Sequence, residues 1–175
     1  MGWQSELDGI IECASMIQRR KGKIVFVLAG SGPALERYRG LARGLTNVLF
    51  PGWLGAAEIH TLMQRSRLGL APYRKTQNLL GNIPNKPIEY LSAGLPVATT
   101  AMGILPELLM KHQCGLAYDA ENPASLEAIL REFEDDPKKL LAMSVNALAL
   151  YNQAFRSDIV YGRMADYLER LGRLR

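Results

Sequence analysis

The chain has 175 residues, of which 48% are hydrophobic and 22% are charged, with two cysteines and a net charge of +4. This composition argues against disorder, a disulfide scaffold and a membrane span, because the apolar fraction is ordinary, cysteines are few and no long uncharged apolar run occurs. The positive surplus allows anionic partners but is too small to predict nucleic-acid binding.

The N-terminus carries an acid early, at Glu6, and leads into no apolar segment, so it does not resemble a secretory signal. We therefore expect a cytoplasmic location, with the inner face of a membrane as the alternative. Cys13 and Cys114 stand in apolar stretches without a C-x-x-C motif or a histidine cluster. Both are interpreted as buried small side chains, and not as zinc or redox ligands.

Apolar residues recur at helical spacing over residues 7–17, and a continuous apolar run follows over residues 23–29. The pattern predicts a helix and then a buried strand. Arg19, Arg20 and Lys21 lie between them and are interpreted as the solvated end of the helix, where cations favour the helix dipole.

The alternation of helix and strand continues downstream. Further helices are predicted over residues 34–43, 56–65, 85–93 and 105–112, and further strands over residues 47–50, 68–72, 96–100 and 115–118. Short buried strands separated by helices are typical of a parallel sheet that is built from right-handed crossovers and covered on both faces. The predicted fold is a doubly wound, Rossmann-like α/β domain with a mostly parallel sheet.

The last part of the chain, residues 123–175, is predicted to be helical and to belong to the same domain. Helices are expected over residues 124–134, 137–151 and 157–171, where Asn-Pro, Asp-Pro and Ser-Asp pairs open them. Doubly wound domains usually begin with a strand, whereas this chain runs directly into a helix. We therefore expect residues 1–175 to form one domain that lacks its first strand and comes from a longer protein.

Ligands of open α/β sheets bind beyond the carboxyl ends of the strands, so the loops there are the candidate site. Gly30, Ser31 and Gly32 follow the first strand and open a helix, where their amides could face an anion. A simple tight turn explains them equally well. A nicotinamide dinucleotide motif would need glycine where Leu35 stands, and no P-loop motif occurs.

The most informative segment is GNIPNKPIEYLSAGLPV, residues 81–97. Asn85 is expected to cap a helix after Pro84, with Lys86 in its first turn, so that free amides, the helix dipole and an ammonium group converge where a phosphate could bind. Glu89 is an acceptor that could receive hydrogen bonds from sugar hydroxyls. A phosphate beside a ribose describes a nucleotide, although an ordinary capped helix with exposed charges remains the alternative.

Residues 84–97 resemble the P-x-K-x-x-E-Y-x-x-x-G-x-P-V segment of GT-B glycosyltransferases of the family 4 type, the glycosyl transferases group 1. Other segments are similar to pieces of that family's C-terminal donor-binding domain and occur in the same order. They are residues 27–33, 48–53, 70–72, 103–107 and 115–116. The resemblance extends over roughly residues 3–135 and implies the C-terminal half of a GT-B enzyme.

The resemblance also implies roles for individual positions. Glu89 corresponds to the glutamate that binds the nucleotide ribose. The residues that correspond to those lying against the diphosphate and the transferred sugar are Ile83, Pro84, Asn85 and Lys86, and those that flank the base are Phe50, Pro51, Gly52 and Trp53. Gly81 departs from the family, which often has a sugar-contacting glutamate there, so the identity of the sugar stays open.

The implied activity is transfer of a sugar, with retention of configuration, from a nucleoside diphosphate sugar to an acceptor, as in polysaccharide biosynthesis. No cofactor or metal is expected, and His60 and His112 are interpreted as structural. Glu107 is interpreted as an acid that favours the start of its helix. No catalytic residue is assigned in this chain.

The expected partners are the nucleotide sugar and, through an N-terminal domain outside this chain, an acceptor sugar or lipid-linked glycan. The full enzyme could associate peripherally with a membrane, nucleic acid is not expected, and the isolated domain is expected to be inactive. Two alternatives stay open: a non-catalytic flavodoxin-like module, although the strand ends lack the aspartate that a receiver domain needs, and a nucleotide-sugar epimerase of GT-B architecture.

Overall fold

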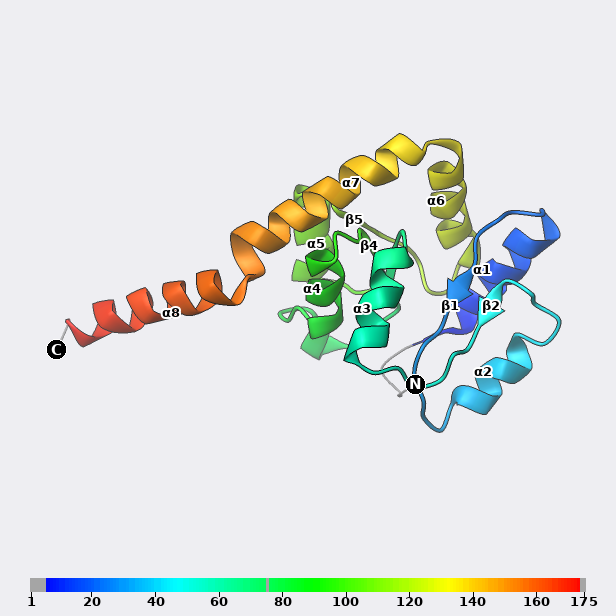
Figure 1. The fold of residues 1–175 in the computed structure, drawn as a ribbon, viewed down its shortest axis with the longest axis horizontal. Coiled ribbons are helices and arrows are strands. Elements are labelled where there is room, and N and C mark those ends of the chain that lie inside the picture. The colour runs from blue at the N-terminus through cyan, green and yellow to red at the C-terminus, as the bar shows by residue number, and fades with distance from the viewer. Residues whose placement is uncertain (1–5, 75, 174–175) are drawn as a thin grey trace.

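A computed structural model of the chain describes residues 6–74 and 76–173, which fold into alternating strands and helices (Figure 1). The strands are β1 (Phe26–Val27), β2 (Val48–Leu49), β3 (Gly69–Ala71), β4 (Val97–Thr99) and β5 (Gly115–Ala117). The α-helices are α1 (Asp8–Arg19), α2 (Leu35–Leu41), α3 (Ala56–Arg65), α4 (Asn85–Ser92), α5 (Ile104–Lys111), α6 (Pro123–Asp135), α7 (Pro137–Leu150) and α8 (Ser157–Gly172). A 3₁₀ turn (Gln77–Leu79) precedes α4, and a π-helical turn (Tyr151–Phe155) joins α7 to α8.

All strand pairs are parallel, which confirms the predicted α/β fold with a parallel arrangement of strands. The strands form two groups: β1 pairs with β2, and β4 lies between β3 and β5. Each predicted helix and strand occurs within a few residues of its expected place. The strands are shorter than the apolar runs that predicted them, because ladder pairing covers only two or three residues of each run.

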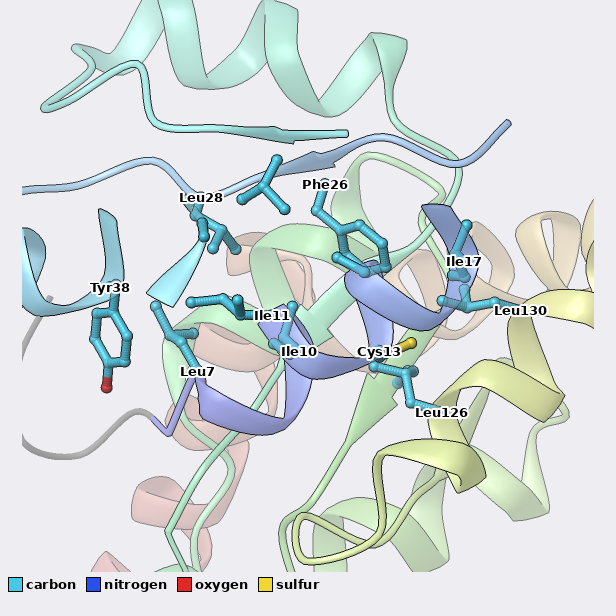
Figure 2. Close-up of a cluster of buried hydrophobic side chains, with 14 residues drawn as sticks. Leu7, Ile10, Ile11, Cys13, Ile17, Phe26, Leu28, Tyr38, Leu126 and Leu130 are labelled. Atoms are coloured by element: carbon cyan, nitrogen blue, oxygen red, sulfur yellow. The ribbon is translucent and has the colours of Figure 1, made fainter. Parts of the chain in front are cut away.

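The first hydrophobic core lies around α1 (Figure 2). Ile10 and Ile17 are at most 1% exposed and belong to one cluster with Phe26 and Leu28, which reach toward α1 from β1 and its end. Leu126 of α6 completes this cluster on the other side of the helix. The broad apolar face that predicted α1 is thus buried between a strand and a second helix.

The same cluster extends from one strand group to the other. It includes Val48 of β2 and Ala98 of β4, and Leu70 of β3 packs against it. A second cluster around β3 and β4 includes Leu91 of α4 and Leu105 of α5, both 0% exposed. Helix α1 therefore spans both strand groups, while α4 and α5 pack on the three-stranded group.

The face of β1 and β2 that points away from α1 is uncovered. Val25, Val27 and Leu49 are 54%, 37% and 50% exposed. The prediction that residues 23–29 form a strand buried on both faces is therefore wrong for β1. The physical reason is that α1 covers only one side of this strand pair.

The basic end of α1 is an ion-pair cluster and not simply a solvated helix end. The Arg20 guanidinium donates to Glu127 of α6 at 2.7 Å and also pairs with Glu134. Glu127, only 4% exposed, accepts a second ion pair from Arg131 at 2.9 Å. Arg19, Arg20 and Lys21 are exposed, as a solvated helix end requires, and α6 in addition brings two carboxylates to Arg20.

The two cysteine side chains are both 0% exposed, which confirms that they are buried. Burial raises the pKa of the Cys13 thiol to about 12, with a smaller contribution from the charge of Glu127. Burial also raises the pKa of Cys114 to about 11. Since the thiolate is the nucleophile, both groups are held in the unreactive form at neutral pH.

We expect neither cysteine to react with a disulfide reagent in the folded chain at about pH 8, where an unperturbed thiol is partly ionised. Both are expected to react within the dead time once the chain is unfolded in guanidinium. The measurement is the absorbance released by the reagent with and without denaturant. Fast reaction of one thiol in the native chain would show that its core opens readily.

Helix α8 projects away from the body of the domain (Figure 1). None of its residues is buried. Its large apolar side chains, each at least 42% exposed, recur at helical spacing and are Val160, Tyr161, Met164, Tyr167, Leu168 and Leu171. They form an apolar stripe along the helix. Within residues 6–74 and 76–173, no helix has both the length and the apolar character needed to cross a bilayer.

Candidate functional site

The loops that follow β1 and β2 are joined by a backbone hydrogen bond. The Gly30 N–H donates to the Gly52 carbonyl at 2.6 Å. Both glycines have a positive φ, 130° and 82°, which side-chain-bearing residues rarely adopt. The structure thus brings the candidate residues Gly30, Ser31 and Gly32 beside the candidate turn of residues 50–53.

The turn after β2 is largely exposed. Trp53 is 75% exposed, and Pro51 is exposed beside it, whereas Phe50 is half-buried against the α1 core. An indole that lies open to solvent at the carboxyl end of a strand presents a flat apolar surface to which a ring can stack. This turn is therefore available to a ligand.

Two buried threonines hold the carboxyl ends of β3 and β4 together. The Thr99 hydroxyl donates to the Ala71 carbonyl at 2.9 Å, and the Thr100 hydroxyl donates to the Tyr73 carbonyl at 2.6 Å. Both threonines are at most 4% exposed. Because buried, satisfied hydroxyls fix the backbone around them, this part of the site is preorganised.

The chain that leads into α4 is fixed against the start of α5. The Ile104 N–H donates to the Leu80 carbonyl at 3.1 Å. Gly103, the residue before, has φ +85°, and a Cβ built there would lie 2.2 Å from the Leu80 carbonyl oxygen. Only glycine allows this approach, so Gly103 positions the loop of residues 77–84.

Helix α4 begins at Asn85, and Pro84 occupies the cap position in an extended conformation. The prediction that Asn85 caps the helix is therefore wrong by one residue, because proline with its fixed φ ends the preceding extended chain at position 84. Neither Pro84 nor Pro87 has an N–H group. The backbone donors left free in the first turn are thus those of Asn85 and Lys86, and both residues are exposed.

Glu89 lies one turn along α4 from Lys86 and is exposed on the helix. Burial raises the pKa of Tyr73 to about 12, with smaller contributions from Tyr90 and from the negative charge of Glu89. Tyr73 lies two residues beyond the end of β3. The Tyr90 hydroxyl donates to the Leu70 carbonyl at 3.3 Å and attaches α4 to β3.

The predicted site residues therefore lie in two groups at the carboxyl ends of the strands. The first group is the pair of loops around Gly30 and Gly52. The second is the start of α4, residues 83–89, held by the ends of β3 and β4 and by α5. The pairing of Gly103 with Leu80 was not predicted, although Gly103 stands in a segment that the resemblance included.

Other parts of the chain do not add to this site. A shallow cavity of about 330 Å³ lies between α1 and the end of α2, lined by Asp8 and Arg43 among others, and includes none of the predicted site residues. In the part of the chain that the structure describes, no group of three or more histidines, cysteines or acids could hold a metal ion. His60 is exposed on α3, and His112 follows the last residue of α5.

Comparison with family models decides the family. The model described as "Glycosyl transferases group 1" matches residues 2–149. The chain belongs to this family. The matched part includes both groups of candidate residues and ends at the last turn of α7, so that α8 lies beyond it.

The chain matches only part of the length of its relatives. The GDP-mannose-dependent alpha-(1-6)-phosphatidylinositol monomannoside mannosyltransferase of Mycobacterium tuberculosis is 25% identical over 167 residues, which are 92% of this chain and 43% of that protein. The chain thus spans less than half the length of this relative.

Solved structures give the same fold. The C-terminal domain of the group 1 glycosyl transferase LpcC from Francisella tularensis has a TM-score of 0.73 at 16% identity, covering 90% of this chain and 83% of that one. Anabaena HepE in complex with UDP-glucose has a TM-score of 0.75 at 18% identity, covering 97% of this chain and 46% of that one. The fold is therefore that of the C-terminal half of a GT-B glycosyltransferase.

Proposed function

We propose that the chain binds a nucleoside diphosphate sugar and forms the donor half of a retaining glycosyltransferase. The observation that carries this proposal is the start of α4, where two free backbone donors and the Lys86 ammonium are exposed together at the positive end of the helix dipole. Glu89 follows one turn later on the same helix and is exposed, so its carboxylate can accept hydrogen bonds from the hydroxyls of a ribose.

The diphosphate is assigned to Asn85 and Lys86. Helix amides and an ammonium group provide hydrogen bonds and positive charge to phosphate oxygens, and they would stabilise the charge that grows on the diphosphate as the sugar leaves. Ile83 and Pro84 precede them in the loop fixed by Gly103 and are assigned to the sugar and diphosphate as well. No metal or cofactor is invoked in this proposal.

The nucleoside is assigned to Glu89 and to the turn at Gly52 and Trp53. A carboxylate accepts two hydroxyl groups, which suits the 2′ and 3′ hydroxyls of a ribose. The exposed indole of Trp53 offers a surface for the base. The relatives named above use GDP-mannose or bind UDP-glucose, so they support the donor class and leave the base and sugar open.

The reaction would break the bond between the anomeric carbon and the diphosphate oxygen and form a bond from that carbon to an acceptor hydroxyl on the same face. The diphosphate keeps the bonding electrons, and the acceptor loses its proton. The acceptor, a sugar or lipid-linked glycan, is assigned to a part of the protein outside this chain. We therefore expect this chain to bind a donor without transferring the sugar.

The proposal is tested by titrating UDP and GDP into the chain in a calorimeter. We expect Glu89→Ala and Lys86→Ala each to weaken binding of the preferred nucleotide by about tenfold or more, the effect of losing one charge-assisted hydrogen bond.

Two exposed positions provide matched controls. Lys138 is the second residue of α7, and Lys86 is the second residue of α4. Glu169 lies on α8. We expect Lys138→Ala and Glu169→Ala to leave the affinity unchanged. A folded chain that binds neither nucleotide, or that binds all four variants alike, would contradict the assignment.

A further inference from the structure

Helix α4 packs on the sheet through one row of buried side chains. The row consists of Pro87 and Leu91, which are four residues apart and therefore lie on the same face of the helix. Leu91 is 0% exposed and belongs to the same core cluster as Val97 of β4. A single row fixes the distance of a short helix from a sheet, but it leaves the helix able to roll about that row.

Tyr90 adds a second contact, to one side of this row. Its ring lies against the backbone of Gly69 in β3, because a Cβ built on Gly69 would be 2.4 Å from Cδ2 and 2.5 Å from Cγ of Tyr90. Only glycine at this position lets the ring approach the strand so closely. The Tyr90 hydroxyl reaches the next residue of β3 and donates to the Leu70 carbonyl at 3.3 Å. The side chain therefore holds the second turn of α4 on this strand.

The main chain of Tyr90 takes part in the end of the helix as well. Its carbonyl accepts from the Ala93 N–H at 3.1 Å and from the Leu95 N–H at 2.9 Å. Leu95 lies in the segment that leads into β4. Tyr90 thus joins α4 to β3 by its side chain and to the approach of β4 by its backbone, and a shift of this residue would move the second half of the helix.

Glu89 precedes Tyr90 and depends on this anchor for its direction. Successive residues of an α-helix are about 100° apart around the axis, so the contact of Tyr90 with β3 sets the direction of Glu89. A carboxylate lies about 6 Å from the helix axis, and a roll of the helix by about 20° would move it by about 2 Å. The range of hydrogen-bond lengths is only about 0.5 Å wide, so such a roll would break the bonds that Glu89 makes.

The start of α4 has a support of its own. The Leu80 carbonyl accepts from the Ile104 N–H at 3.1 Å and fixes the loop that leads into the helix. Lys86 lies in the first turn, beside this support, whereas Glu89 and Tyr90 lie in the second. Loss of the Tyr90 anchor should therefore disturb Glu89 more than Lys86.

We propose that Tyr90 is a positioning residue of the donor site: its ring, packed on Gly69, directs the Glu89 carboxylate to the ribose hydroxyls. The inference rests on the proposed function, since it explains how a residue assigned to the ribose is oriented. Tyr90 is given no contact with the nucleotide. It governs the contribution of the ribose to the affinity, while the diphosphate is bound independently at the first turn of α4.

The test is calorimetric titration of UDP or GDP, whichever binds more tightly, and of the 2′,3′-dideoxy form of the same nucleotide. Tyr90→Leu removes the ring and should weaken binding of the ribonucleotide by about fivefold or more, but binding of the dideoxy form by less than about twofold. Tyr90→Phe keeps the ring on Gly69, so it should bind the ribonucleotide within about threefold of the parent chain. In a chain that already carries Glu89→Ala, Tyr90→Leu should have little further effect, because both changes remove the same interaction.

Tyr118→Leu is the matched control. Tyr118 directly follows β5, is half-buried and packs against the core around α1. Within the described residues, its buried hydroxyl has no hydrogen-bond partner. We expect this change to lower the melting temperature, as Tyr90→Leu does, and to leave both affinities unchanged. If both variants lost affinity alike, the cause would be a general loss of stability and not the orientation of Glu89.

Other results would also overturn the inference. If Tyr90→Leu weakened the ribonucleotide and its dideoxy form equally, or had its full effect in the Glu89→Ala chain, the ring would not act through Glu89. If the parent chain bound a nucleotide and Tyr90→Leu bound it as tightly, the inference would fail and the proposed function would stand. If the parent chain bound neither nucleotide, the proposed function would fail, and the inference with it.

Discussion

Gly103→Ala is expected to reduce nucleotide affinity by at least about tenfold, although position 103 has no assigned contact with the ligand. The alanine Cβ would lie 2.2 Å from the Leu80 carbonyl oxygen and 2.6 Å from its Cα, so the loop that leads into α4 must move. The backbone of Gly103, with φ 85° and ψ −142°, is also close to a region that only glycine occupies readily.

The measurement combines calorimetric titration of UDP or GDP with thermal unfolding. Gly81→Ala is the matched control, because a Cβ at Gly81 meets nothing within 4 Å. We expect the control to keep both its affinity and its melting temperature. If Gly103→Ala binds as well as Gly81→Ala, the Leu80 loop does not position the site.

The second large effect is expected at Glu127. Glu127→Ala should lower the free energy of unfolding by about 2 kcal/mol, because it removes the charge-assisted hydrogen bonds of Glu127 to Arg20 and Arg131 and empties a buried position. The acid is 4% exposed and pairs with both Arg20 and Arg131. Chemical denaturation in urea, analysed at a common slope, measures the difference.

Glu132→Ala is the comparison for this change, since Glu132 pairs with Lys139 in an exposed position on the same helix. Exposed pairs contribute about 0–1 kcal/mol, so the control should unfold almost as the parent does. Equal losses for the two variants would mean that the Arg20 cluster adds nothing beyond a surface ion pair.

The elements of the fold were predictable because their signals are local. The helical spacing in α1 and the positive φ of Gly94, which ends α4 at 70°, both agree with the sequence pattern. The partner of Arg20 was not predictable, since Glu127 is 107 residues away in the sequence. The exposure of Val25 and Val27 was also missed, because an apolar run predicts a strand but does not show whether one or both faces of that strand are covered.

The residues of the candidate site could be predicted from the sequence better than the contacts that hold them in place. Lys86 and Glu89 were identified because their spacing on a helix start has a direct chemical meaning. The cap was misplaced because Asn85 has the stronger capping preference, whereas Pro84 fixes the backbone. The Gly103–Leu80 contact depends on how two loops meet, and no spacing in the sequence encodes that.

Because the apolar stripe of α8 is exposed, the stability of this helix depends on whether another surface binds to the stripe. A helix of 16 residues with no buried side chain is close to the length at which isolated helices are only marginally stable in water. Any surface that covered Tyr161, Met164 and Leu168 would shift the helix–coil equilibrium of α8 toward the helix. Formation of α8 and association with such a surface would then be coupled, so that each strengthens the other.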